Sequence, residues 1–296
     1  MKKLLVTGAS GFLGWHLCQI ANQEQWEVYG TYSTKFIDIP DIKIIKIDLT
    51  DFQEIKTLFH HLKPDAVIHT AAQSQPNYCQ LYPQDAYTIN VTASCHIAGL
   101  CADNSLPLAF TSTDLVFDGL NPPYQETDKV SPVNIYGEQK VQAETGILKV
   151  YPPAAICRMP LMFGNETPTA KSFIQPFIQT LKDGKELSLF IDEFRTPVSA
   201  DTAAKGLLLA LEQVHGIIHL GGKERISRYD FGKILVEVLQ LPSEQLKSCL
   251  QADVKMAAPR PKDVSLDSAK AFALGYKTLS VRAELEIFKS TSSSFN

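Results

Sequence analysis

The sequence lacks several features that would place it in particular classes of protein. It has no apolar run approaching the roughly 20 residues that a transmembrane helix needs. Its six cysteines are scattered, and no two of them form a Cys-x-x-Cys pair. They therefore predict reduced thiols, mostly buried, and not a disulfide framework or a zinc site. We expect a cytoplasmic protein that contacts no membrane and binds no metal.

A surplus of positive charge is also missing. The formal net charge is −4 at pH 7, which offers no electrostatic basis for binding nucleic acid. The remaining composition is ordinary for a soluble globular protein, because 45% of the residues are hydrophobic and 20% are charged. A chain of 296 residues can form one large domain or two smaller ones, with a sizeable core.

Residues 7–14, TGASGFLG, are the most informative stretch. They follow a short apolar run and lead into a helical pattern of apolar residues, so they predict a strand, a tight turn and a helix. Gly8 permits the sharp turn, Gly11 lets a pyrophosphate approach the backbone, and Gly14 lets the helix pack on the strand. The free N–H groups at the helix N-terminus also attract phosphate. We predict that this stretch binds a dinucleotide.

The first half of the chain alternates between strand-like and helical patterns. Further strands are predicted at residues 28–32, 42–47, 66–70, 108–112 and 154–158, with helices at 51–62, 83–102 and about 131–149. Asp51 is a plausible N-cap, and Pro132 suits the first turn of a helix. This order is typical of βαβ units. We expect an α/β fold of Rossmann type, a doubly wound parallel sheet with helices on both faces.

The pattern changes after residue 160. Helical patterns at 173–182, 202–212 and 228–239 are separated by strand-like pieces at 187–190 and 216–220. We predict a Rossmann domain at residues 1–163, rejoined by about 194–222, and a smaller mixed lobe at 164–193 and 223–296. Ligands of doubly wound sheets bind beyond the carboxyl ends of the strands. The smaller lobe would therefore close over cofactor and substrate.

The end of the second predicted strand bears on the choice of cofactor. NAD-selective sites usually carry an acidic residue there, whereas this chain has Tyr32, Ser33 and Lys35. Hydroxyl groups and a lysine suit the 2′-phosphate of NADP(H), which we favour over NAD(H), although a neutral loop could also ignore the ribose. Asp48 and Leu49 are placed to flank the adenine, and Asp48 could equally be a turn residue or a helix cap.

Polar residues after the fifth predicted strand indicate the chemistry. Thr113 ends that strand, and Tyr136 and Lys140 are four residues apart, so they share one face of the next helix. Reduction of a ketone by hydride leaves an alkoxide, which a tyrosine can protonate if a nearby ammonium lowers its pKa from about 10. Lys140 can also reach the nicotinamide ribose. Tyr-x-x-x-Lys alone is a common accident, but its combination with the glycine stretch predicts a catalytic set.

These motifs resemble those of the extended short-chain dehydrogenase/reductases. The matching segments are TGASGFLG, STDLVFDG at residues 112–119 and YGEQK at 136–140, and the resemblance covers nearly the whole chain. Within that family, residues 112–119 and 125–140 are most similar to the dTDP-4-dehydrorhamnose reductase-like subgroup. The resemblance implies that Thr113, Tyr136 and Lys140 are catalytic and that Asn90 supports the lysine through a water. It implies cofactor contacts, besides those already named, at Ser10, Phe12, Leu13, Thr70, Ala71, Ala72 and Met159.

The resemblance also implies a substrate and a reaction, namely reduction by NADPH of the 4-keto group of a nucleotide-activated deoxysugar. Arg195 and Arg260 would bind the diphosphate, because the planar guanidinium group holds two oxygens at once. Each could instead be a surface arginine in an ion pair. Asp114 would bind the sugar or simply pin the loop after the strand.

Two alternatives stay open. Residues 73–79 differ from the Thr-Ala-Val-Asp-like run expected of rhamnose enzymes, so the sugar and the base are undetermined. A nucleotide-sugar epimerase with retained NAD, or a regulatory subunit resembling the methionine adenosyltransferase β subunit, would also suit the motifs. Leu115 argues against a dehydratase, which needs Asp-Glu after the threonine. Relatives can pair through a metal-bridged interface, but Glu284 and Glu286 cannot be matched to it, so a homodimer is an open question.

Overall fold

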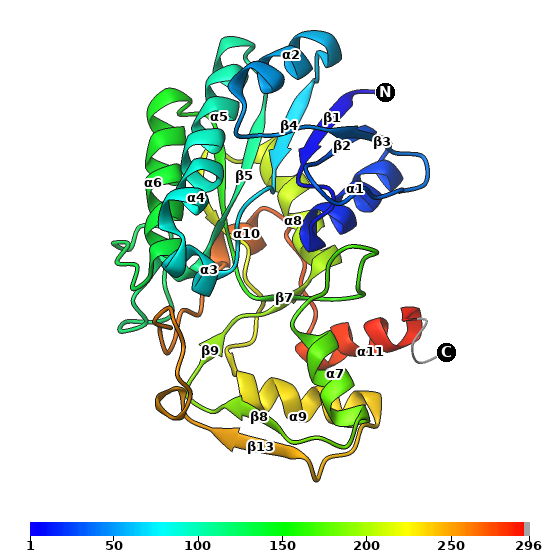
Figure 1. Ribbon diagram of the computed structural model, residues 1–296, viewed down its shortest axis with the longest axis vertical. Coiled ribbons are helices and arrows are strands. Elements are labelled where there is room, and N and C mark those ends of the chain that lie inside the picture. Colours follow the sequence, from blue (N-terminus) through cyan, green and yellow to red (C-terminus); the bar gives the residue numbers. More distant parts are fainter. Residues whose placement is uncertain (293–296) are drawn as a thin grey trace.

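A seven-stranded parallel sheet forms the centre of the computed structural model, which describes residues 1–292 (Figure 1). The last four residues of the predicted second lobe lie outside this range. The strand order is β11-β6-β5-β4-β1-β2-β3. These strands are β1 (Lys3–Thr7), β2 (Glu27–Tyr32), β3 (Lys43–Lys46), β4 (Ala66–His69), β5 (Leu108–Thr113), β6 (Ala155–Met159) and β11 (Gly216–His219). The predicted fold class is confirmed. The chain moves outward in opposite directions from β1 and β4, which places the switch point of the sheet between these two strands.

Helices cover both faces of this sheet, as alternation of side chains along the strands requires. On one face α1 (Phe12–Gln23) packs against α8 (Ala200–Gln213) over Leu4 and Val6 of β1. On the other face α2 (Phe52–Leu62), α5 (Ser94–Asp103) and α6 (Ile135–Val150) pack over Leu5 of the same strand. Successive residues of one strand therefore belong to two separate cores.

Two helix boundaries show how local capping decides where a helix begins. The Asp51 side chain accepts hydrogen bonds from the N–H groups of Gln53 and Glu54, so α2 begins as predicted. The helix expected from residue 131 begins instead at Ile135, because the Asn134 side chain accepts a hydrogen bond from the Gly137 N–H. An Asn cap outweighs a proline in the preceding loop.

The long helix predicted at residues 83–102 is divided. It consists of α4 (Pro83–Tyr87), a π-helical turn η1 (Thr88–Ala93) and α5. A further short helix, α3 (Pro76–Leu81), follows β4 and was not predicted. Wider π-helical turns occur frequently at functional sites, and η1 contains Asn90.

A smaller mixed lobe lies below the sheet in Figure 1. Its core packs α7 (Ile174–Lys182), α9 (Arg228–Leu239) and α11 (Val281–Thr291) together, beside the parallel pair β8 (Leu187–Phe190) and β13 (Leu246–Cys249). Short pairs join β7 (Met162–Phe163) to β10 (Val198–Ser199) and β9 (Phe194–Arg195) to β12 (Ile226–Ser227). The remaining elements of the whole described chain, not all of them in this lobe, are η2 (Asp114–Val116), η3 (Gln251–Asp253) and α10 (Ala269–Ala273). Within residues 1–292, no helix combines the length and apolar character that crossing a membrane demands.

Candidate active site

One large cavity, of about 1320 Å³, collects residues from the carboxyl ends of the sheet strands and from the smaller lobe. Every residue predicted to bind cofactor or substrate lines it, and so do Thr113, Tyr136 and Lys140. Asn90 is the exception among the predicted site residues, since it is fully buried and does not line the cavity. The topology therefore gathers in one place residues that are more than 200 positions apart in the chain, from Gly8 to Arg260.

The glycine turn at one end of the cavity is closely packed. Gly8 has φ +78°, and a Cβ atom there would lie 2.7 Å from the Ala71 Cα. A Cβ on Gly14 would overlap the Gly8 carbonyl oxygen. The Gly11 N–H donates to the Gly8 carbonyl oxygen at 2.9 Å, and among the described residues no side chain caps α1 at Gly11. Uncapped N–H groups in a turn that side chains would fill suit a pyrophosphate.

The neighbouring rim contains the residues predicted to meet the adenosine ribose. Tyr32, Ser33 and Lys35 line the cavity just after β2, with Asp48 after β3. Asp48 accepts hydrogen bonds from the N–H and the hydroxyl of Thr50 at 2.8 and 2.7 Å, and these bonds lower the pKa of its carboxyl. The turn role left open for Asp48 is therefore present, alongside its place in the cavity wall. Among the described residues, the rim after β2 presents Lys35 and no carboxylate to the cavity.

The three predicted catalytic residues meet further along the cavity. Thr113 ends β5, while Tyr136 and Lys140 project from the first turns of α6. Tyr136 is 7% exposed and Lys140 is 1% exposed, and the Lys140 Nζ lies 4.2 Å from the centroid of the Phe110 ring. Such burial of an ammonium is costly. A cation–π contact offsets part of that cost.

The pKa directions in this group differ from the sequence-based expectation. Burial raises the pKa of Tyr136, and a hydrogen bond with Thr113 opposes this rise only in part. Burial also lowers the pKa of Lys140 to about 7, although Glu144 acts against this change. The expected lowering of the tyrosine pKa is therefore wrong for the chain by itself, because loss of water dominates both groups. The raised pKa of Tyr136 favours the protonated phenol, the form that can donate a proton.

Asn90 does not line the cavity, but it forms hydrogen bonds with residues behind the cavity wall and within it. Its side-chain oxygen accepts from the Gln73 N–H at 2.8 Å. Its amide group donates to the Gln73 carbonyl oxygen at 3.1 Å and to Gln139 Oε1 at 2.9 Å. These partners belong to the loop after β4 and to α6. The support of Lys140 through a water, implied by the family resemblance, stays a prediction.

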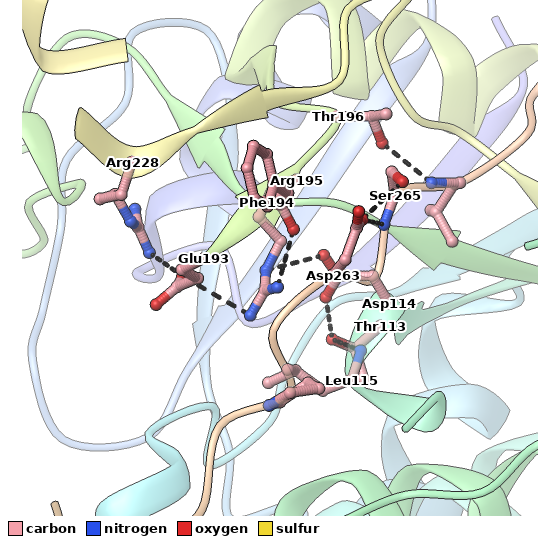
Figure 2. A network of polar contacts seen from close by, with 12 residues as sticks. Thr113, Asp114, Leu115, Glu193, Phe194, Arg195, Thr196, Arg228, Asp263 and Ser265 are labelled. Atoms are coloured by element: carbon pink, nitrogen blue, oxygen red, sulfur yellow. Dashed lines mark hydrogen bonds and ion pairs between the residues drawn. The ribbon is translucent and has the colours of Figure 1, made fainter. Parts of the chain in front are cut away.

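A chain of charged groups links the smaller lobe to the end of β5 (Figure 2). The Arg195 Nε lies 3.4 Å from Asp114 Oδ2, and its Nη2 lies 3.5 Å from Glu193 Oε1. Arg228 reaches the same Glu193 oxygen at 2.9 Å. Asp114 in turn accepts a hydrogen bond from the Thr113 hydroxyl at 3.2 Å. Arg195 and Asp114 therefore form a buried ion pair and also line the cavity, and their contact with a substrate stays a prediction.

Burial and charge oppose each other in this chain of groups. Burial raises the pKa of Asp114 to about 6, although Arg195 favours the carboxylate. Burial likewise raises the pKa of Glu193, but Arg228 and Arg195 together bring it below its usual value. Glu193 was missed in the sequence, where its position two residues before Arg195 was the only signal. Arg228 was noted only as the start of a helix.

Two further arginines line the cavity beside Arg195. The Nη1 atom of Arg228 is buried and has no hydrogen-bond partner within residues 1–292. Arg260 is half-buried, and it donates to the Ala258 carbonyl oxygen at 3.1 Å and to Asn77 Oδ1 at 3.2 Å. Together with Arg195, Arg228 and Arg260 place three guanidinium groups near the carboxylates of Asp114 and Glu193. This end of the cavity suits an anionic ligand.

Glu284, one of the acidic residues near the C-terminus, has a structural role. Glu284 is buried, and it accepts hydrogen bonds from the Ser199 N–H and from the Thr202 hydroxyl, the latter at 2.8 Å. It thereby satisfies donors at the N-terminus of α8. Over the range 1–292, His, Cys, Asp and Glu side chains form no group of three or more that could hold a metal ion.

The chain matches the family model described as RmlD substrate binding domain over residues 1–291. It is 29% identical over 282 residues to the methionine adenosyltransferase 2 subunit beta of Rattus norvegicus, which covers 93% of this chain and 83% of that protein. It is 31% identical over 266 residues to a probable low-salt glycan biosynthesis reductase, Agl14, of Haloferax volcanii, covering 88% of each. A solved structure, a hypothetical dTDP-4-dehydrorhamnose reductase from Sulfolobus tokodaii, has a TM-score of 0.82 and 33% identity, covering 95% of this chain and 98% of that one.

Proposed function

This chain belongs to the RmlD substrate binding domain family, among the extended short-chain dehydrogenase/reductases as its motifs predicted, and we propose that it reduces the 4-keto group of a nucleotide-activated deoxysugar with NADPH. The observation that carries the proposal is the composition of one cavity. A turn suited to pyrophosphate, the set of Thr113, Tyr136 and Lys140, and a group of arginines all line it.

The cofactor would lie along the carboxyl ends of the strands. The glycine turn and the N-terminus of α1 would hold its pyrophosphate. Lys35 and Ser33 would meet a 2′-phosphate, and the absence of a carboxylate from the described rim after β2 supports NADPH over NADH. NADPH, when bound, supplies the hydride. All further chemistry falls to side chains of this protein.

Tyr136 would donate the proton that the reduction requires. Its phenol carries a proton at neutral pH even at the ordinary tyrosine pKa of about 10, and burial raises this pKa further. The Thr113 hydroxyl, at the end of β5, would turn from Asp114 and donate its hydrogen bond to the oxygen of the reacting carbonyl. The nearby Lys140 ammonium would stabilise the phenolate that forms once Tyr136 has given its proton to the new alkoxide. The cavity then lowers the barrier by orientation and by proton transfer.

The nucleotide diphosphate would bind at the arginine end of the cavity. The unpartnered Nη1 of Arg228 and the half-buried guanidinium of Arg260 are the groups available to it. Arg195 would act mainly through Asp114, which it holds beside Thr113. Asp114 would then contact the sugar from a fixed position.

The test is oxidation of NADPH at 340 nm in the presence of dTDP-4-keto-6-deoxy-L-mannose, with NADH in parallel. We expect turnover with NADPH, weaker turnover with NADH, and a loss of at least about 100-fold in kcat for Tyr136→Phe, because general acid catalysis contributes on that order. Full activity of Tyr136→Phe would refute the assignment. Tyr151→Phe, at the C-cap of the same helix, is the matched control.

A regulatory role is the second candidate. It is supported by the methionine adenosyltransferase 2 β subunits, which match 93% of this chain. Co-purification of this chain with a methionine adenosyltransferase catalytic subunit, together with absence of turnover on keto sugars, would favour it. We also propose a cytoplasmic homodimer, which size-exclusion chromatography and cell fractionation would examine.

A further inference from the structure

The segment of residues 73–83, which follows β4 and contains α3, forms one wall of the cavity. Gln73, Gln75, Pro76 and Tyr78 line the cavity directly. Tyr136 and the arginines line the same cavity. This segment is also the one whose sequence departs from the run expected of rhamnose enzymes. How it is held in place therefore bears on which sugar nucleotide the cavity accepts.

Two buried amide side chains hold this segment at both of its ends. Asn90 pairs with the backbone N–H and carbonyl of Gln73 at the start of the segment. Gln139, which is 4% exposed, donates from Nε2 to the carbonyl oxygen of Pro83 at the other end, at 2.8 Å. The two amides are joined to each other, because Asn90 donates to Gln139 Oε1 at 2.9 Å. We call this pair the amide clamp.

The clamp connects the segment to the helix that carries the catalytic groups. Gln139 lies on α6 between Tyr136 and Lys140, so its hydrogen bonds attach the segment to this helix. Within the segment, the Cys79 thiol donates to the Gln73 carbonyl oxygen at 3.2 Å. The wall therefore behaves as one braced unit, attached at Gln73 and at Pro83.

The same segment reaches the smaller lobe through Asn77. The Asn77 side-chain oxygen accepts from the Ala258 N–H at 3.1 Å and from Arg260 Nη2 at 3.2 Å. A guanidinium that is held by an acceptor on a braced segment has fewer orientations to lose when a ligand binds. Asn77 thus orients the Arg260 guanidinium, and the amide clamp keeps the segment that carries Asn77 in place.

We propose that Gln139 is a positioning residue for the sugar nucleotide, which acts through the braced segment 73–83 and Asn77 on Arg260. The inference rests on the proposed function for its choice of substrate. A glutamine is required because its amide both accepts from Asn90 and donates to Pro83. A leucine of similar size can do neither. A glutamate keeps the acceptor but loses the donor.

Kinetics of Gln139→Leu provide the first test, with Gln142→Leu as control, since Gln142 is exposed on the same helix. We expect KM for the sugar nucleotide to rise about tenfold in Gln139→Leu, the scale of one buried hydrogen bond left unmade. The Kd of NADPH should change by less than about twofold, because the cofactor turn lies elsewhere. Equal losses of affinity for both ligands, or an unchanged KM, would overturn the proposal.

Asn77→Ala tests the orientation of Arg260 without disturbing the fold, because Asn77 is exposed and its removal leaves the amide clamp intact. We expect it to raise the same KM with little change in kcat, and to reduce the preference for a diphosphate-linked sugar over the corresponding sugar monophosphate. An unchanged KM in Asn77→Ala would contradict the proposed route through Arg260.

Hydrogen exchange tests the clamp without reference to any reaction. In the NADPH-bound protein, the backbone amides of residues 73–83 should exchange at least about tenfold faster in Gln139→Leu than in the wild-type chain or in Gln142→Leu. Unchanged exchange would refute the clamp. If exchange is faster in Gln139→Leu but the wild-type protein reduces no keto sugar, the proposed function is refuted and the amide clamp is supported. If Gln139→Leu does not fold, Gln139→Glu takes its place in both experiments.

Discussion

We expect Lys140 to destabilise the folded protein relative to an uncharged side chain of similar size at the same position. Its ammonium is buried beside Phe110, and burial lowers its pKa from 10.5 to about 7. Lys140→Met keeps the length and apolar character of the side chain while removing the charge. We expect this variant to lose turnover and to gain stability, as residues retained for function often trade one against the other.

The magnitude and its pH dependence follow from proton linkage. At about 1.4 kcal/mol per pH unit, the lowered pKa of Lys140 corresponds to a destabilisation on the order of 3–5 kcal/mol. Below pH 7 both the folded and the unfolded chain carry this proton, so the full cost of burying it is present. Between pH 7 and 10.5 the unfolded chain binds more protons, and the contribution of Lys140 to stability therefore improves as pH rises.

Urea denaturation of the cofactor-free protein at pH 6 and pH 9 measures this effect. Lys140→Met should exceed the wild type by several kcal/mol at pH 6, and this advantage should shrink by about 2–3 kcal/mol at pH 9. Lys149→Met is the control, because Lys149 is exposed in the last turn of the same helix. A variant that is less stable than the wild type at pH 6, or a difference independent of pH, would refute the reasoning.

Three other substitutions, one of them with a surface control, test the core and the predicted cofactor site. Glu144→Ala should lower the free energy of unfolding by about 3–5 kcal/mol, because it leaves the buried Arg158 guanidinium without its carboxylate. Glu237→Ala, which breaks an exposed ion pair, should leave the free energy of unfolding close to that of the wild type in the same urea titration. Gly14→Ala should abolish NADPH binding measured by fluorescence titration, since its Cβ would overlap the backbone of the glycine turn, and retained affinity would contradict the packing argument. Lys35→Ala should weaken NADPH binding about tenfold and leave NADH binding unchanged, the scale of one charge-assisted hydrogen bond; equal effects on both cofactors would argue against a 2′-phosphate site.

Much of the fold follows from rules that act within a few residues. The apolar runs, the glycine turn and the Asp51 cap specify strands and helices locally, and alternation of strands with helices requires a parallel sheet. The carboxyl ends of parallel strands lie at the same edge of a sheet. The strand pattern alone therefore predicts that residues such as Thr70 and Thr113 lie at one edge. For the same reason the predicted cofactor and catalytic residues share one cavity.

The remaining features depend on partners that are distant in the chain. Arg195 looks like any arginine in the sequence, and only folding brings it to Asp114, with Glu193 and Arg228 completing the chain of charges. The partners of Asn90 likewise come from two other segments.

The sequence by itself therefore determined the fold class and the glycine turn, and it predicted the residues proposed for the cofactor and for catalysis, because each is encoded by local pattern and spacing. The tertiary structure alone decided the direction in which the pKa values of Tyr136 and Lys140 shift and the partners of the arginines and of Gln139. Burial reverses the pKa direction expected from an adjacent ammonium. Burial is a property of the whole packed chain, and no short stretch of sequence specifies it.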